Sequence, residues 1–387
     1  MTRHKRRKIK SMIKCLLAVV LPAGAAACLR GAVFIRSAVS DETKDELNSI
    51  SIASASLEDI SSESVSRLVR EDELFAGKTI LSEGYGIIDE SDEPGELLSL
   101  PSPLDMDCPY PGEKPYPAVW NAGGDVIRTT YGEYIGSSFF SIEGGGQVNN
   151  KTDIPNDRLM KESRCLPNFT VPDTDEPLVL LYHTHTTESF EPFVRENYDS
   201  SFNYRTTDCT KNVVMVGDAI QAELEAQGIG VIHATEIHDY PSYNGSYSRS
   251  RETVTALMEK YPSIKVVLDI HRDAIGGENC AYQPYITVDG KEAAQIMIIS
   301  GCDDGTLGMP DYMQNFHFAC TLQKQLEADN SGFTRPVLFD YRHYNQDLTN
   351  GSLLIEVGSH GNTLEQVQYA GQLLGRSLGK LLNSMKR

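Results

Sequence analysis

The sequence is short of positive charge, and this limits the partners it can have. It contains 35 Lys and Arg residues against 54 Asp and Glu residues, which gives a formal net charge of −19 at pH 7. A nucleic-acid-binding surface needs a basic footprint that neutralises phosphates. We therefore expect no nucleic acid among the partners of this protein.

The sequence also lacks cysteines at the close spacing that zinc sites use. The chain has 8 cysteines but no C-x-x-C sequence, so a zinc site built from cysteine pairs is not expected. Cys15 and Cys28 fall in an apolar N-terminal segment. The other six are compatible with disulfides outside the cytoplasm or with buried free thiols: Cys108, Cys165, Cys209, Cys280, Cys302 and Cys320.

Histidine is almost absent from the first 182 residues of the chain. Of the 9 histidines, only His4 precedes His183, and the other eight lie between His183 and His360. Imidazole is the side chain that most readily exchanges protons and binds metals near neutral pH. Catalytic chemistry is therefore expected in the C-terminal half.

The N-terminus (1–36) lacks an uninterrupted apolar run of membrane-spanning length. Seven Lys or Arg and no acid precede the apolar run 15–29, whose fifteen residues fall short of the ~20 that a full span needs. The run becomes long enough if it continues through Arg30 to residue 35. This is possible because the Arg30 side chain can snorkel to the membrane interface. This pattern predicts a membrane signal anchor, which we favour over cleavage at the alanine-rich 23–27. In both cases the rest of the chain lies outside the cytoplasm.

Residues 37–118 lack the apolar patterning of a folded domain. Between 41 and 96 there are sixteen acidic and four basic residues, and six prolines follow between 98 and 117. Such a segment cannot bury enough apolar surface to offset its ordering entropy, and the prolines stiffen it. We predict a disordered stalk between the anchor and a catalytic domain at 119–387.

The C-terminal half alternates predicted strands and helices, which indicates an α/β fold. We predict one domain with a mixed, mostly parallel sheet flanked by helices, and Asp289-Gly290 predicts a hairpin turn. Strand pieces at 138–142 and from 147, with a short helix at 157–161, come first. The later strands are expected at 178–182, 229–234, 264–270, 285–288, 294–300, 337–341 and 353–357, and the helices at 213–228, 249–261, 312–329 and 364–381.

The strand predicted at 178–182 leads directly into metal-binding residue types. It is apolar throughout, as expected of a strand buried on both faces, and His183, His185 and Glu188 follow it. Zinc needs an imidazole nitrogen and a carboxylate oxygen about 2.0–2.2 Å away, and a His-x-x-Glu spacing at a strand end directs both into one cleft. We predict Glu188 as one ligand and either His185 or His183 as another.

Two later strands end in the same residue types. His271 follows the strand 264–270, and Glu356 lies at the end of the strand 353–357. A catalytic zinc usually has three protein ligands and one open position. We predict His271 as the third ligand and Glu356 as a general base beside the metal.

Four separate motifs carry a family resemblance. In chain order they read LLYHTHTTESF, HDYPSYNGSYSRSR, VLDIHRDA and NGSLLIEVGSHGNT. Over roughly residues 119–382 the chain resembles the stage II sporulation protein P family, which are membrane-anchored cell-wall hydrolases of spore-forming bacteria. The resemblance implies a zinc N-acetylmuramoyl-L-alanine amidase that degrades septal peptidoglycan during engulfment, with an associated endopeptidase activity on cross-links.

The resemblance also implies a fold, a location and partners. The fold would be that of amidases and zinc carboxypeptidases. The catalytic domain would face the intermembrane space of the sporulation septum, with the N-terminal anchor in the membrane. A sporulation protein D-type lytic transglycosylase and an M-type membrane protein would be the partners.

The wider amidase superfamily has a histidine after a strand and a glutamate in an E-x-G-x-x-x-N setting, which correspond to His271 and Glu356. Its ligand glutamate lies further along the chain. Here Glu188 follows His185 by three residues, as in zinc carboxypeptidases. A residue near Asp208 is therefore an alternative second ligand.

Candidate substrate contacts surround these residues. Arg272 is suited to bind a substrate carboxylate, because a guanidinium binds carboxylates bidentately. The alternative is a salt bridge between Arg272 and Asp273. A glycan or peptide groove is expected along the loop that holds Tyr243, Asn244, Tyr247 and Arg249. The remaining histidines are interpreted as structural: His233, His238, His317, His343 and His360.

Two other functions stay open at this point. The His-x-x-Glu spacing favours a zinc carboxypeptidase or endopeptidase that cleaves stem peptides only. A catalytically inactive wall-binding scaffold is the third interpretation. Against it stands the intact set of predicted site residues, His185, Glu188, His271 and Glu356.

Overall fold

The computed structural model describes residues 114–202, 204–277 and 279–386. The predicted anchor and nearly all of the predicted stalk lie outside the described residues. The described residues all belong to one compact unit of the chain, Leu74–Arg387. Within this part of the chain, none of the helices combines the length and the apolar composition of a membrane span.

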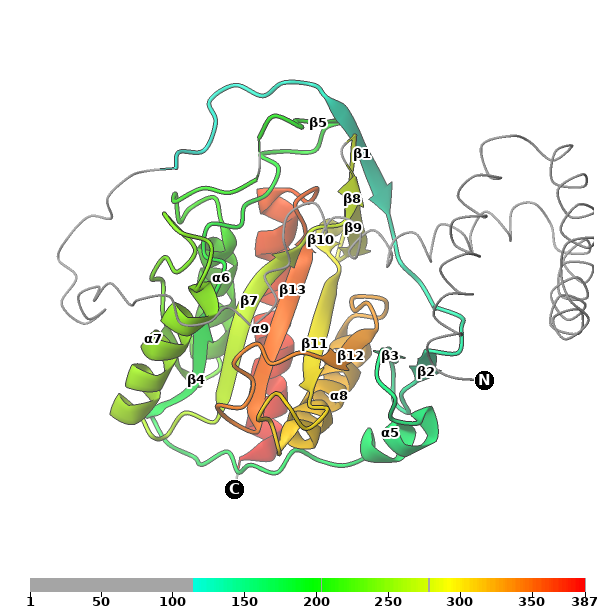
Figure 1. Cartoon of the computed structure of the whole chain (residues 1–387), viewed down its shortest axis with the longest axis vertical. Coiled ribbons are helices and arrows are strands. Elements are labelled where there is room, and N and C mark those ends of the chain that lie inside the picture. The colour runs from blue at the N-terminus through cyan, green and yellow to red at the C-terminus, as the bar shows by residue number, and fades with distance from the viewer. Residues whose placement is uncertain (1–113, 203, 278, 387) are drawn as a thin grey trace, which may run out of the picture. The chain divides into compact units, whose positions relative to one another are not determined.

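An eight-stranded sheet forms the centre of the domain (Figure 1). Its strand pairs are parallel except β2–β3 and β11–β13, so the predicted mixed, mostly parallel α/β fold is confirmed. Across the sheet the strands are β2 (Phe139–Ser141), β3 (Gln147–Asn150), β12 (Val337–Tyr341), β11 (Ile296–Cys302), β13 (Gly351–Ser359), β7 (Val266–Asp273), β4 (Pro177–Tyr182) and β6 (Gly230–His233).

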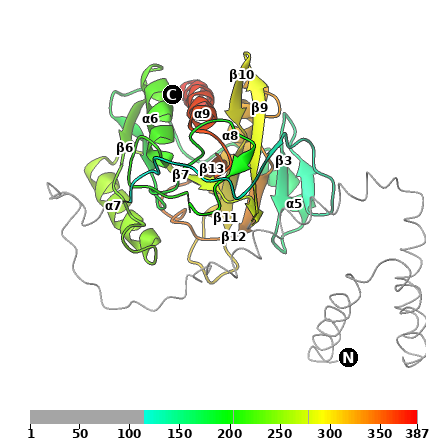
Figure 2. The same cartoon turned by 90° about the horizontal axis from the view of Figure 1, so that it is seen from above.

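Helices cover both faces of this sheet. Figure 2 shows α6, α8 and α9 on one side and α7 on the other, and α5 packs against α8 and β2 at the sheet edge. Parallel strands require such cover, because their connections cross the faces as helices. The helices are α5 (Asn156–Glu162), α6 (Val213–Glu225), α7 (Ser246–Lys260), α8 (Tyr312–Asp329) and α9 (Leu364–Met385).

Strand β4 connects the cores on the two faces. Val179 and Leu181 join the larger cluster, which includes residues of α6, α8 and α9, whereas Leu180 and Tyr182 pack with Val254 of α7. Successive side chains of a strand point to opposite faces, so a strand covered on both sides must be apolar throughout. The prediction of a doubly buried strand at 178–182 is confirmed.

A second, smaller sheet lies beside the first, and the sequence pattern predicts only part of it. It contains β10 (Lys291–Ala294), β9 (Cys280–Val288), β1 (Gly124–Thr129) and β5 (Asn197–Tyr198), and β8 (Gly276–Gly277) pairs with β9. β1 and β5 are short and half exposed. Their sequences therefore lack the apolar alternation by which a strand is recognised.

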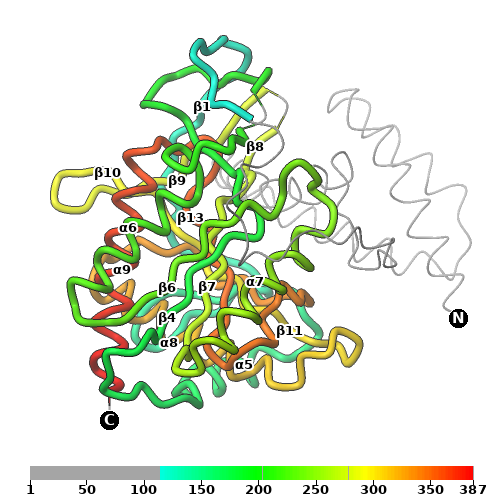
Figure 3. The backbone as a smooth tube through the Cα atoms, turned by 90° about the vertical axis from the view of Figure 1, so that its left-hand side faces the viewer, coloured from blue at the N-terminus to red at the C-terminus, as the bar shows by residue number. Residues whose placement is uncertain are grey.

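The hairpin predicted at Asp289-Gly290 is confirmed, but its second strand is not the predicted one. β10 ends at Ala294, and after Gln295 the chain enters β11 of the central sheet. Gln295 is buried, and its side chain binds backbone groups of Tyr131 and Gly332. In Figure 3 the β9–β10 hairpin projects as a yellow loop beside α9.

Strands β7 and β13 extend beyond their predicted ends. The sequence predicts His271 just after a strand and Glu356 near a strand end, but β7 continues to Asp273 and β13 to Ser359. His271 and Glu356 are partners in the parallel β7–β13 pairing. The two side chains are therefore held by the rigid sheet rather than by loops.

The described cysteines are free thiols. Cys165 is exposed, Cys209 and Cys280 are half-buried, and Cys302 and Cys320 are buried. Of the two alternatives from the sequence, free thiols rather than disulfides therefore describe these five residues. Cys108 lies outside the described residues.

Candidate active site

Three neighbouring strands bring the predicted catalytic residues together. β13, β7 and β4 are adjacent in the central sheet, and all three run in the same direction. Glu356 lies near the carboxyl end of β13, His271 near that of β7, and His185 and Glu188 follow β4. In open α/β sheets, ligands bind at the carboxyl ends of the strands.

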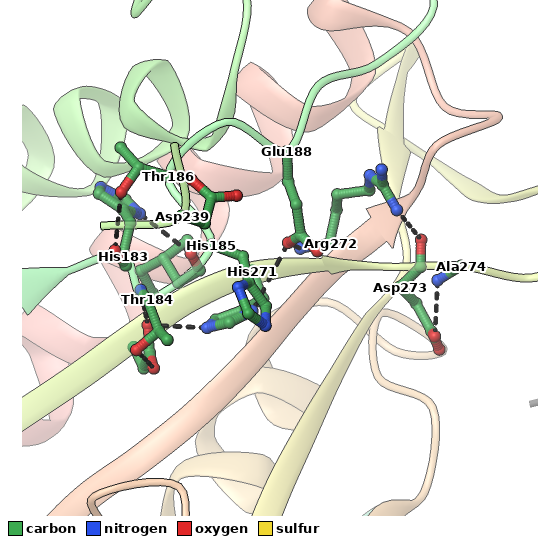
Figure 4. Close-up of polar contacts among 12 residues, drawn as sticks. His183, Thr184, His185, Thr186, Glu188, Asp239, His271, Arg272, Asp273 and Ala274 are labelled. Atoms are coloured by element: carbon green, nitrogen blue, oxygen red, sulfur yellow. Dashed lines mark hydrogen bonds and ion pairs between the residues drawn. The ribbon is translucent and has the colours of Figure 1, made fainter. Parts of the chain in front are cut away.

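His271 and Glu188 face each other in a geometry that fits a metal ion. His271 Nδ1 lies 3.5 Å from Glu188 Oε2 (Figure 4). Two ligands that are each about 2.0–2.1 Å from a tetrahedral zinc lie about 3.3 Å apart. Both side chains are buried, and the backbone N–H of Arg272 donates to the same Oε2 at 3.1 Å. The separation of these two atoms is therefore close to what zinc requires.

A second carboxylate supports His271 from its other side. Asp269 Oδ1 lies 2.8 Å from His271 Nε2, a close ion pair, and also accepts the backbone N–H of Thr184 at 2.8 Å. Metal-binding histidines commonly direct their second nitrogen to a carboxylate, which fixes the ring and leaves the first nitrogen for the metal. Asp269 and His271 share a face of β7 because they are two residues apart. Asp269 was not among the residues predicted from the sequence, although its i, i+2 spacing from His271 is a signal that could have found it.

The site stabilises positive charge at His271. Burial opposes the imidazolium, but Asp269, Glu188 and Glu356 outweigh it and raise the pKa of His271 to about 9. The neighbouring His185 behaves oppositely, since burial, followed by the charge of His271, lowers its pKa well below the usual value. One imidazole is thus held as a cation and the other as a neutral base. A divalent cation bound here would neutralise the charge of the same carboxylates.

His185 lies beside this pair but has other partners. Its ring stands edge-on to His271, with centroids 5.2 Å apart, and stacks on Tyr243 at 4.6 Å. His185 Nε2 is 3.0 Å from the Tyr243 hydroxyl, and Nδ1 is 3.4 Å from Ser246 Oγ. The donor atoms of His185, Glu188 and His271 do not all lie within 4.8 Å of one another. Metal ligation by His185 therefore requires it to release one of these contacts.

His183, the alternative first ligand, does not join the group. Its Nδ1 lies 2.9 Å from the carbonyl oxygen of Ile270, and its Nε2 lies 2.8 Å from His233 Nε2. The side chain is fully buried, close to Gly217 of α6. The alternation of β4 continues past its end, so His183 points to the α6 face, as Leu181 does.

Asp208, near which an alternative second ligand is predicted, has local partners of its own. Its carboxylate accepts the backbone N–H and the hydroxyl of Thr210, a local turn contact. Glu188 is the carboxylate that reaches His271, and Arg205 Nη2 binds its other oxygen at 3.3 Å. The three-residue spacing after His185 therefore corresponds to the observed geometry.

Comparison with known proteins identifies the family. The family model for stage II sporulation protein P matches residues 142–379. The chain belongs to this family. Stage II sporulation protein P of Bacillus subtilis (strain 168) is 30% identical over 207 residues, which are 51% of this chain and 49% of that protein. The chain thus matches about half the length of that relative.

Solved amidase structures are similar at a lower level. AmiC2 of Nostoc punctiforme, an N-acetylmuramoyl-L-alanine amidase, has 10% identity and a TM-score of 0.32, covering 54% of this chain and 96% of that one. Ami1 of Mycobacterium smegmatis has 14% identity and a TM-score of 0.32, covering 56% and 100%. The CwlD amidase of Clostridioides difficile, solved with the GerS lipoprotein, has 12% identity and a TM-score of 0.31, covering 54% and 99%.

In this member of the family, Arg272 contacts backbone groups with the guanidinium that was predicted to bind a substrate carboxylate. Its guanidinium donates to the backbone oxygens of Ser189, Tyr204 and Asp273, and the side chain is buried. The expected side-chain salt bridge with Asp273 is absent too, because Asp273 Oδ2 pairs with Arg335 at 2.9 Å. Arg272 therefore braces the segment after β4.

The predicted Tyr/Asn/Arg loop divides into two parts. Tyr243 is 42% exposed and Tyr247 stands edge-on to His185, so these two rings border the site. Arg249 is instead a loop brace, with its guanidinium donating to the backbone oxygens of His238, Ser242 and Asn244. Of the four predicted residues, Tyr243 and Asn244 are exposed, whereas Tyr247 and Arg249 are half-buried.

The other histidines have contacts outside the His271–Glu188 pair. His238 binds the His183 carbonyl and Thr253, and His343 pairs with Asp347 at 3.1 Å. Burial, followed by the nearby Arg272 charge, lowers the pKa of His360 to about 3, so this ring is neutral. His317 pairs with Glu162 at the opposite edge of the sheet.

Proposed function

We propose that the chain is a peptidoglycan hydrolase of sporulation that cleaves the N-acetylmuramoyl–L-alanine amide bond with zinc. The observation that supports this most is His271, held between Asp269 on one ring nitrogen and Glu188 on the other, beside Glu356. Family membership agrees with a cell-wall hydrolase. A structural histidine has no need of three carboxylates around it.

The donor set fits zinc chemically. His271 Nδ1 and Glu188 Oε2 would bind the metal, with His185 as the third ligand after release from Tyr243. Two imidazoles and one glutamate form a known catalytic zinc set. Bound zinc supplies a Lewis acid, which polarises an amide carbonyl and lowers the pKa of water.

The proton transfers fall to Glu356. Its side chain is buried on β13, next to His271. It would accept a proton from the attacking water as the oxygen bonds to the lactyl carbonyl carbon. When the carbon–nitrogen bond breaks, Glu356 would return that proton to the departing alanine nitrogen.

Other residues position the reacting groups. Asp269 holds the His271 ring, while Arg205 and the Arg272 backbone hold Glu188. Tyr243, which stacks on His185, and Tyr247, which stands edge-on to it, would contact the substrate as aromatic walls. Such pre-organised geometry removes entropy from the reaction step.

Product analysis tests the reaction. The full chain, purified in detergent with zinc, is incubated with isolated peptidoglycan and the fragments are identified by mass spectrometry. An amidase releases complete stem peptides with a free alanine amino group and leaves bare glycan. Release of shortened stems alone would replace the proposal with a stem-peptide protease, and no release would favour the wall-binding scaffold.

A zinc carboxypeptidase or endopeptidase is the second candidate. The structure brings Glu188, three residues after His185, to His271, and this spacing is the one that resembles zinc carboxypeptidases. The same fragment analysis separates the two reactions, since only a peptidase shortens the stems.

We also propose that an N-terminal anchor holds this domain outside the cytoplasm at the sporulation septum, with a D-type transglycosylase and an M-type membrane protein as partners. The basic and apolar pattern of residues 1–36 supports the anchor. Reporter fusions after residue 36 test it: activity of an extracytoplasmic reporter is expected, and activity of a cytoplasmic one would contradict it.

A further inference from the structure

A second cluster of metal-binding side chains lies at the β2 edge of the domain. It consists of Glu162, the last residue of α5, Cys165 in the following turn, and His317 on α8. One donor atom from each lies within 4.8 Å of the other two, and His317 Nε2 is 2.8 Å from Glu162 Oε2. Among the residues that the structure describes, no other group of three His, Cys, Asp or Glu donors meets this closely.

Local backbone structure creates the cluster. The backbone N–H of Cys165 donates to the Glu162 carbonyl at 2.9 Å, which turns the chain and returns the thiol to the carboxylate. Lys324, two turns beyond His317 on α8, donates to the carbonyl of Ser163 at 2.7 Å. The end of α5 is therefore already attached to α8 through polar contacts.

The cluster is separate from the candidate active site around His271 and Glu188. α5 contacts β2 and α8, and strands β3, β12 and β11 intervene before β13 (Figure 1). None of the three residues contacts a residue of the His271–Glu188 pair. A metal here would not touch the reacting atoms.

Helix α5 has few apolar contacts. It has seven residues, of which only Leu159 is buried, and Met160 is partly buried against the core. Helices of this length are unstable without tertiary packing. A metal shared between α5 and α8 would supply the cross-link that its short apolar face does not provide, because metal binding energy becomes folding energy.

We propose that Glu162, Cys165 and His317 bind a zinc ion that clamps α5 to α8. Thiolate, imidazole and carboxylate are all zinc ligands, whereas Mg²⁺ and Ca²⁺ prefer oxygen alone. His317 is buried, Glu162 is half-buried and Cys165 is exposed, so the fourth position opens to water. Binding removes the Cys165 thiol proton.

Cobalt substitution tests the site through its thiolate. Co²⁺ bound to a thiolate has a charge-transfer band in the near ultraviolet, which a site of histidine and glutamate lacks. In the full chain carrying His271→Ala, one equivalent of Co²⁺ is expected to produce the band. Adding Cys165→Ser should abolish it, whereas Cys280→Ser, at a half-buried thiol on β9, should preserve it. A band that survives Cys165→Ser, or no band at all, would overturn the proposal.

Zinc protection of the thiol is a second measurement, made first on the unmodified chain. Cys165 is exposed and should react with iodoacetamide in the metal-free full chain. One equivalent of Zn²⁺ per cluster should slow this alkylation by about 10-fold or more, because a metal-bound thiolate is a poor nucleophile. Glu162→Gln should restore much of the rate. An alkylation rate that is unchanged by zinc would contradict the site, whatever happens to amide hydrolysis.

Discussion

The two proposed metal sites in this domain are built in different ways. His271 and Glu188 lie in or after strands of the central sheet, are at most 5% exposed, and are oriented by Asp269, Arg205 and backbone N–H groups. At the sheet edge, Glu162, Cys165 and His317 lie close together on a helix end, a turn and a second helix.

The difference shows that closeness and pre-organisation are separate properties. The edge cluster has three donors close together but few supporting contacts. The buried pair has only two donors in place, yet the Asp269 carboxylate holds His271, and the Arg205 guanidinium and a backbone N–H hold Glu188. Pre-organisation of that kind suits chemistry, because catalytic groups must keep their geometry while the substrate changes. A structural cross-link needs only the donors.

The largest contrast is expected between His271→Ala and Cys165→Ser. His271→Ala removes the proposed ligand and should abolish peptidoglycan cleavage, with the loss of about one zinc per chain. Cys165→Ser should also lose about one zinc but retain full cleavage. Zinc is measured by elemental analysis and cleavage by fragment release. Equal loss of cleavage in both variants would show that the two clusters are not functionally separate.

Glu356→Gln should lower turnover by about 10²–10⁴-fold, which is the usual contribution of a general base. Its zinc content should match that of the unmodified chain, because Glu356 is assigned to proton transfer and not to ligation. Single-turnover rates and elemental analysis of the same sample test both parts. Unchanged turnover would remove Glu356 from the mechanism.

Asp269→Asn should lower zinc affinity at the buried site by about 10–100-fold, as expected when a carboxylate behind a histidine ligand is lost. In metal-free protein the pKa of His271, about 9, should fall, because Asp269 is the strongest of the groups that raise it. Competition with a zinc chelator gives the affinity and NMR titration gives the pKa. The cobalt band assigned to Cys165 should be unaffected.

The smallest expected effect is on the stability of the fold, at Asp347. This residue lies in the same loop as Tyr344, which stacks on Tyr247. Burial raises the pKa of Asp347, but bonds from Arg251 and His343 outweigh it and hold the pKa below the usual value. Asp347 therefore adds stability above pH ~4 that is lost as the pH falls further. Because Arg251 is 40% exposed, this amounts to about 1 kcal/mol.

Asp347→Asn should flatten the dependence of the free energy of unfolding on pH below about 4. Urea unfolding is measured in the His271→Ala/Cys165→Ser background, so that acid release of metal from either cluster does not contribute. If stability falls as steeply with pH in the Asp347→Asn variant as in this background alone, other carboxylates carry the acid sensitivity.

Local patterning predicted the elements that bury a continuous apolar stripe. The helix Tyr312–Asp329 and the strand Val337–Tyr341 have the predicted bounds, because apolar periodicity records which face is buried. The weak strands β1 and β5 were missed, since they are stabilised by pairing with neighbours distant in sequence rather than by their own pattern.

The sequence alone determined the α/β class and a short set of residues, His185, Glu188, His271 and Glu356, that the sheet brings to one end. Only the tertiary structure decided that His183 turns to the α6 face, that Arg272 braces the backbone, and that Asp269 stands behind His271. The reason is physical: periodicity encodes burial residue by residue, whereas the partner of a polar side chain depends on which distant strand lies next to it.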